Sequence, residues 1–144
     1  MSNILTVPLI TMRVATSNDS DWRMSFAVTI PDDDAVQQPV DLRDIMFLLR
    51  VWRLSGGHEI FLSSEDDMDA VTISGTDYNI VNVVFLVDRM ARVPVGTWPF
   101  EIIVTGDGAT LELVNGTIVH GTDGGSIITS MTAVSRNILE TETA

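Results

Sequence analysis

The chain has 144 residues and a mass of 15.7 kDa, which suits one domain that buries a hydrophobic core without disulfides or metal ions. Hydrophobic residues make up 45% of it and charged residues 19%, so the composition excludes an intrinsically disordered protein. Its eight basic residues, all arginines, stand against twenty acidic residues. The resulting net charge of −12 disfavours a nucleic-acid-binding protein, because phosphate groups need a concentrated basic surface.

Cysteine is absent, which excludes a disulfide framework, a thiolate zinc site and a cysteine nucleophile. Hydrophobic runs such as residues 83–87 are far shorter than the ~18 residues that span a membrane as a helix. The first residues lack the basic segment of a signal peptide. We therefore expect a protein that contacts neither a membrane nor nucleic acid.

Apolar residues recur along the chain with a period of two, and valine, isoleucine and threonine dominate, which is typical of half-buried β-strands. Residues 1–14 contain a first candidate strand, which belongs either to the sheet or to an N-terminal arm. Pro31 ends the second strand, and residues 32–39 then form a polar loop that begins with three aspartates. The second strand has one predicted buried face, made of Trp22, Met24, Phe26, Val28 and Ile30.

The middle of the chain continues as strand-sized segments separated by turns. Residues 45–52 are apolar on both faces, which predicts a strand that is covered on each side. This spacing predicts an all-β fold, an Ig-like antiparallel β-sandwich over residues 1–120. The other predicted elements are strands at 58–63, 70–74 and 78–87, a helical turn or corner at 88–93, and strands at 97–105 and 109–120 joined by a tight Gly-Asp-Gly turn.

The last segment, residues 121–144, differs from the middle. Residues 121–125 are a flexible hinge by composition. The apolar residues after the hinge have partly helical spacing and are too few to form a core of their own. We therefore expect a flexible or extended C-terminal arm that packs on another subunit, and hence a homo-oligomer. The candidate contact residues of this arm are Ile127, Ile128, Met131, Val134, Ile138 and Leu139.

The sequence predicts no catalytic, cofactor-binding or metal-binding residues. Residues 32–34 and 65–69 are acidic but lack the EF-hand pattern, and solvated loops explain them better than a bound cation. His58 and His120 have no neighbouring ligand at zinc spacing, so we interpret each as a surface or strand-end histidine. The chain contains no Gly-x-Ser-x-Gly segment, and its glycine-rich stretches open no phosphate-binding helix. These patterns favour a non-enzymatic protein.

Trp98 is a further candidate contact residue. Trp22 and Phe26 share the predicted buried face, whereas Trp98 follows Val95-Gly96-Thr97 at the entrance of a strand. A tryptophan at such a place can expose part of its ring to a partner. A position in the core is the alternative.

Several segments between Trp22 and Val119 occur in an order that resembles a family of bacteriophage virion β-sandwich domains. Such domains are found in upper baseplate proteins and in tail- or fibre-associated proteins. The chain departs from the pattern at Glu101, where the family often has Asp, and after Val119, where a final Val-Thr is usual. The matching segments are Trp22, Pro39-Val40-Asp41-Leu42, Phe47-Leu48-Leu49-Arg50-Val51, Phe61-Leu62-Ser63-Ser64, Val71-Thr72-Ile73, residues 82–87, residues 93–101 and residues 111–119.

The resemblance implies a virion structural protein, made in the host bacterial cytoplasm, that acts as an adaptor in the tail, baseplate or neck and docks neighbouring virion subunits. The same features suit a head decoration or head-fibre anchoring protein. A carbohydrate- or receptor-binding module, with Trp98, Trp52 and the acidic loops as its site, is the alternative from another class. The family pattern also favours a β-bulge at Gly116 over a two-residue turn at Asn115-Gly116.

Overall fold

The computed structural model describes residues 4–53, 59–106 and 108–139, and β-strands dominate it, as the period-two pattern predicts. One short helix interrupts the strands within these residues, at the predicted helical turn. No helix of the described part is long and apolar enough to cross a membrane. The elements are β1 (Ile4–Ser17), β2 (Trp22–Ala27), β3 (Thr29–Pro31), β4 (Gln37–Pro39), β5 (Met46–Arg53), β6 (Glu59–Ser63), β7 (Val71–Ser74), β8 (Ile80–Phe85), α1 (Val87–Met90), β9 (Gly96–Gly106), β10 (Ala109–Gly121) and β11 (Ile127–Leu139).

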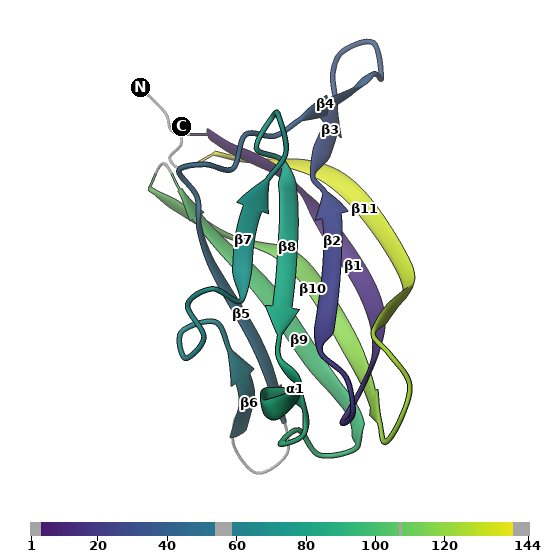
Figure 1. Cartoon of the computed structure of the whole chain (residues 1–144). Helices are drawn as coiled ribbons and strands as arrows, with labels where there is room; N and C mark the ends of the chain where they lie inside the picture. The colour runs from purple at the N-terminus through teal and green to yellow at the C-terminus, as the bar shows by residue number, and fades with distance from the viewer. Residues whose placement is uncertain (1–3, 54–58, 107, 140–144) are drawn as a thin grey trace.

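The strands form two facing layers, with β7, β8 and β2 in front of the longer strands in Figure 1. The large sheet has six strands in the order β11-β1-β10-β9-β5-β6, and the small sheet has three in the order β2-β8-β7. A separate two-stranded ribbon, β3-β4, projects from one end. The arrangement is sandwich-like, and its core lies between the layers.

Trp22 lies at the centre of the core and is fully buried. Its indole stacks on Phe85 of β8 at 5.6 Å and meets the edge of Phe100 of β9 at 5.6 Å, so it joins the two sheets. The predicted buried face of β2 is confirmed for Trp22, Met24, Phe26 and Val28, whereas Ile30 is half-buried. The reason is that β2 ends at Ala27, and Ile30 belongs to β3, where it pairs with Gln38.

Residues 32–39, predicted as a polar loop, contain strand β4 and so complete a hairpin with β3. Asp32 shapes its turn, because Oδ1 accepts hydrogen bonds from the backbone N–H groups of Asp34 at 2.8 Å and Val36 at 3.0 Å. These bonds lower the pKa of Asp32, the bond from Val36 contributing most. The first aspartate of the acidic run therefore has a structural role.

One pair of strands in the large sheet is parallel, which corrects the prediction of a purely antiparallel sandwich. β1 runs parallel to β10, with Ile10 opposite Val114 and Ser17 opposite Gly121, and it lies between β10 and β11. The first strand is thus an interior member of the sheet, which answers whether it is a strand or an arm. Parallel pairing is possible here because the whole domain connects the two strands.

β5 is buried on one face only, so the prediction of a strand covered on each side is wrong. Leu49 and Val51 are fully buried toward the small sheet, whereas Leu48 and Arg50 on the opposite face are half-buried. Arg50 is ion-paired there with Glu101, its neighbour in β9. The phage domains that the sequence resembles often have Asp at this position. In this chain, Glu101 forms a cross-strand ion pair with Arg50.

Strand β10 is continuous through Asn115-Gly116, so the alternative of a two-residue turn is excluded. A register shift does occur, but between Glu112 and Val114 rather than at Gly116. Gly116 lies opposite Phe100 in β9, and a Cβ atom at Gly116 would overlap the Phe100 ring. The glycine is therefore explained by the close approach of an aromatic ring.

Candidate functional site

Residues 127–139 form β11, an edge strand of the large sheet, which corrects the prediction of a flexible C-terminal arm. β11 pairs antiparallel with β1 from Ile4 opposite Leu139 to Ala15 opposite Ile127. The partly helical spacing of its apolar residues is misleading, because Met131 and Val134 lie on opposite faces of an edge strand and a register shift between Ile128 and Ser130 also interrupts the alternation. The segment packs on its own domain.

The predicted contact residues of this segment lie on both faces of β11. Met131 is opposite Met12, a core residue, so both side chains project toward the inner side of the sheet; Met131 is nevertheless 50% exposed. Val134, opposite Leu9, is on the other face and is 61% exposed, and Ile127 is 62% exposed. Ile128 is half-buried against the core. The side chains of Ile138 and Leu139 lie outside the described residues.

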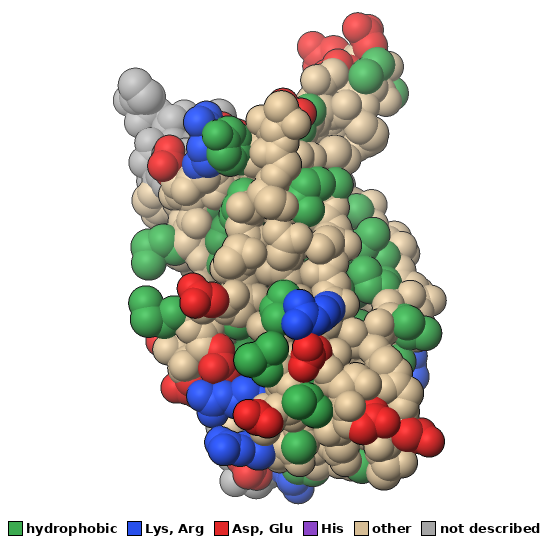
Figure 2. All heavy atoms as spheres, in the orientation of Figure 1, with side chains coloured by type: hydrophobic (Ala, Val, Ile, Leu, Met, Phe, Trp, Pro, Cys, Tyr) green, Lys and Arg blue, Asp and Glu red, His purple; other side chains and the backbone are tan. Residues whose placement is uncertain are grey.

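β11 presents an unpaired backbone along its outer edge within the described residues, because the sheet order ends with it. No residue from Ile127 to Val134 is charged, and none is proline. Figure 2 shows hydrophobic side chains on the flank that β11 forms. Charged residues and prolines are the usual means by which proteins keep edge strands from pairing. This edge therefore lacks such protection from Ile127 to Val134, whereas Arg136 lies farther along the strand and a register shift interrupts its pairing with β1 between Ile128 and Ser130.

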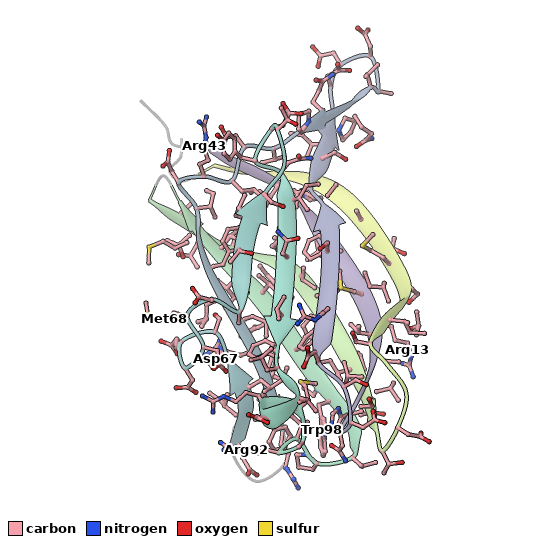
Figure 3. All side chains as sticks on the ribbon, viewed as in Figure 1. Arg13, Arg43, Asp67, Met68, Arg92 and Trp98 are labelled. Carbon is pink, nitrogen blue, oxygen red and sulfur yellow. The ribbon has the colours of Figure 1, made fainter. Side chains whose placement is uncertain are left out.

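Trp98 lies at the end of the sandwich near α1 and is half-buried (Figure 3). Its ring meets Phe61 edge-on at 5.0 Å, and the Arg53 guanidinium lies 5.0 Å from its centroid. Its Nε1 donates a hydrogen bond of 2.7 Å to the Pro94 carbonyl oxygen. These contacts fix the ring in place. β10 and β1 lie between β11 and β9, the strand that carries Trp98, so Trp98 and the β11 residues do not form one common site.

His120 is only 1% exposed, so it is an interior strand-end histidine rather than a surface one. Its Nδ1 lies 2.8 Å from Thr16 Oγ1, and its Nε2 lies 2.6 Å from the Asn18 side-chain amide and 3.1 Å from the Met90 carbonyl oxygen. Burial lowers the pKa of His120. No sequence pattern points to this polar cluster, because its members come from three separate segments. His58, the other histidine, lies outside the described residues.

The acidic segment 65–69 borders a hollow of about 630 Å³ between the β6–β7 loop and β8 with α1. Asp67 Oδ1 is 3.2 Å from Nε of Arg89, while the side chain of Met68, 88% exposed, points away from the domain (Figure 3). Within the described residues, no three Asp, Glu or His side chains gather closely enough to hold a metal ion. The segment is thus partly ion-paired and largely solvated.

Comparison of the chain with protein-family models and with curated proteins gave no match.

Proposed function

We propose that the chain is a non-enzymatic structural protein of a bacteriophage virion, an adaptor in the tail, baseplate or neck that docks neighbouring subunits. Two lines support the proposal. The first is the resemblance of the segments between Trp22 and Val119 to phage virion β-sandwich domains. The second, which carries the structural argument, is the edge of β11, which has no charged residue and no proline from Ile127 to Val134.

The β11 edge supports a role in assembly for a physical reason. A long edge strand offers a row of free N–H and C=O groups to any extended chain that approaches. β11 is 13 residues long, and three of its apolar side chains, Ile127, Met131 and Val134, are at least half-exposed. An edge of this kind is stable against aggregation when another polypeptide covers it, as in a permanent assembly or a homo-oligomer.

We further propose that the sandwich is Ig-like. In Ig domains, strands B, E and D face strands C, F and G. Taken in chain order, β2-β8-β7 corresponds to B-E-D, and β5-β9-β10 corresponds to C-F-G. The short helix α1 between β8 and β9 lies at the position of the E–F connection. β1 and β11 then extend the second sheet beyond this common arrangement.

A head decoration or head-fibre anchoring protein is the rival within the same class, since it would use the same edge. A carbohydrate-binding module is less well supported, because Phe61 and Arg53 already contact the Trp98 ring that would stack on a sugar. Location in the particle therefore separates the leading alternatives.

The test is mass spectrometry of gradient-purified phage particles from a genome that carries the coding sequence, with antibody labelling in the electron microscope. We expect the chain in the particles at a fixed ratio to the other structural proteins, with label on the tail, baseplate or neck. Label on the head would support the rival, and recovery of the chain only in the particle-free lysate would refute the proposal.

A matched pair of variants links incorporation to the edge. Val134→Lys places a charge at an exposed position of the edge strand β11. Thr105→Lys places the same charge at an exposed position of β9, which is not an edge strand. We expect roughly a tenfold loss of particle content for Val134→Lys alone, because a charge on an edge strand opposes strand pairing. Equal incorporation of both folded variants would show that β11 is not part of the docking surface.

A further inference from the structure

The two sheets differ in width, and the difference leaves a groove beside the small sheet. β1 and β11 extend the large sheet past β2, the edge strand of the small sheet. A groove of about 330 Å³ lies between this extension of the large sheet and the segment from the end of β2 to β4. Its floor includes Ile10 and Met131, which project from β1 and β11, and its wall includes Ala27, Thr29 and Pro31.

The outer edge of β2, which reaches the groove at Ala27, carries free peptide groups. Val28 N–H donates to the Asn79 carbonyl, on the side of β8, at 2.8 Å. Because the peptide groups of a strand alternate in direction, those of Arg23, Ser25 and Ala27 point away from β8. The N–H and C=O of Arg23 both bond to Ser126 Oγ, at 2.9 and 3.2 Å. Ser25 and Ala27 have no such backbone partner among the described residues.

The charges around the groove define what fits it. None of the side chains that line it is charged. At the end near Pro31, the turn of the β3–β4 hairpin carries Asp32, Asp33 and Asp34, which are all exposed. Figure 2 shows acidic side chains at this projecting tip. A second copy of the chain, with net charge −12 and no lysine, is a poor electrostatic match for this end.

We propose that the groove accepts an extended segment of another polypeptide, which adds as a fourth strand to the small sheet along β2. The segment alternates apolar and polar residues, so that its apolar side chains cover Met131, which is 50% exposed. Basic residues at one end meet the acidic turn. Strand addition supplies affinity through backbone hydrogen bonds and specificity through alternate side chains. This binding does not depend on where the protein resides, so it can be tested apart from the virion proposal.

The probe is a synthetic peptide of about ten residues that alternates valine and threonine, the length of a typical strand. Two lysines are placed at its N-terminal end in one version and at its C-terminal end in another, because the direction of the added strand decides which end reaches the acidic turn. A counterpart of each carries two glutamates. Binding to the full chain is measured by fluorescence anisotropy and by hydrogen exchange of the Ser25 and Ala27 amides.

Three variants separate the groove from the rest of the surface. Ala27→Pro removes an N–H that points away from β8, so the fold tolerates it while strand addition does not. Met131→Glu places a charge on the floor of the groove, and Thr132→Glu places the same charge on the opposite face of β11. Thermal unfolding of each variant checks that it is folded.

We expect one lysine peptide to bind and to slow exchange at Ser25 and Ala27. Ala27→Pro, Met131→Glu and the glutamate peptides should each weaken binding at least about tenfold, and Thr132→Glu should have no effect. No binding at about 1 mM peptide, equal binding of lysine and glutamate peptides, or undiminished binding to Met131→Glu would overturn the proposal. A dimer that Ala27→Pro converts to a monomer would assign the groove to a second copy instead.

Discussion

Phe100 decides the identity of a residue on the neighbouring strand. Its ring covers Gly116, so that even a methyl group there would overlap it. Phe100 itself packs at right angles against Trp22 and is 1% exposed. An interior packed in this way tolerates added volume poorly.

Gly116→Ala should therefore lower the free energy of unfolding by roughly 1–3 kcal/mol, the usual range for overpacking a core. Urea unfolding monitored by tryptophan fluorescence measures it. Gly125→Ala is the control, because nothing lies within 4 Å of the added methyl group. Identical midpoints for the two variants would show that the Phe100 ring does not lie over Gly116.

His120 predicts a dependence of stability on pH. Its pKa in the folded protein is lowered from 6.5 by burial, so the unfolded chain binds more protons between the two values. The stability associated with neutral His120 is complete above pH 6.5 and is lost as the pH falls from that value through the lower pKa of the folded protein. His120→Gln should flatten the slope of melting temperature against pH below pH 6.5. Parallel slopes for wild type and variant would contradict the buried neutral state.

At the scale of elements, β2 is the strand whose role the sequence predicts best. Its inward residues are large and apolar, and two of its three outward residues, Arg23 and Ser25, are polar, so its period of two indicates one buried face. The sequence of β11 shows no such alternation, because Met131 and Val134 are exposed on opposite faces of the strand. An edge strand that buries little needs no alternation, and its pairing with a strand more than a hundred residues away leaves no local pattern.

The candidate site, too, could be predicted from the sequence only in part. The apolar character of β11 is visible in the sequence, and so is Trp98 at a strand entrance. The groove beside β2 could not be predicted, because it arises from the unequal widths of two sheets. The free peptide groups of Ser25 and Ala27 depend on which side of β2 is paired, and side chains do not encode that choice.

For β2, we expect Phe26→Ala to lower the free energy of unfolding by roughly 3–5 kcal/mol, since Phe26 is 5% exposed. Thr29→Ala should be mild, because its Oγ1 donates only to the exposed Gln37. Chemical denaturation compares the two. Similar losses for both would mean that the inward face of this segment is assigned wrongly.

For β11, a chain that ends at Gly125 should melt at a lower temperature and aggregate. The truncation removes Ser126, which bonds to Arg23 of β2, and uncovers the whole edge of β1. This outcome is the reverse of the one expected for a free arm. Differential scanning calorimetry measures the melting temperature, and light scattering measures aggregation. A soluble truncated chain with an unchanged melting temperature would support the prediction of a free C-terminal arm.

The whole molecule carries a net charge of −12, and its ion pairs do little to offset it. The five described pairs, such as Arg23–Asp21 and Arg53–Glu59, involve partly exposed side chains, and pairs of this kind contribute little. Self-repulsion among the carboxylates therefore governs the response to salt.

The melting temperature should consequently rise as sodium chloride increases from about 10 to 200 mM, because the screening length shortens. Asp33→Asn, which removes one exposed charge at the hairpin tip, should reduce the size of this rise slightly. A melting temperature that falls with salt would show that the ion pairs outweigh the repulsion.

The position of β1 inside the large sheet constrains the order in which the protein can assemble. β1 precedes all other strands of the described residues, yet its two neighbours, β10 and β11, follow all the others. Thr16, for example, can form its hydrogen bond only after His120, 104 residues later, has been synthesised. Such remote pairing slows folding. On the ribosome, the first strand leaves the exit tunnel with both edges bare, and chaperones or neighbouring nascent chains meet it before the sheet can close.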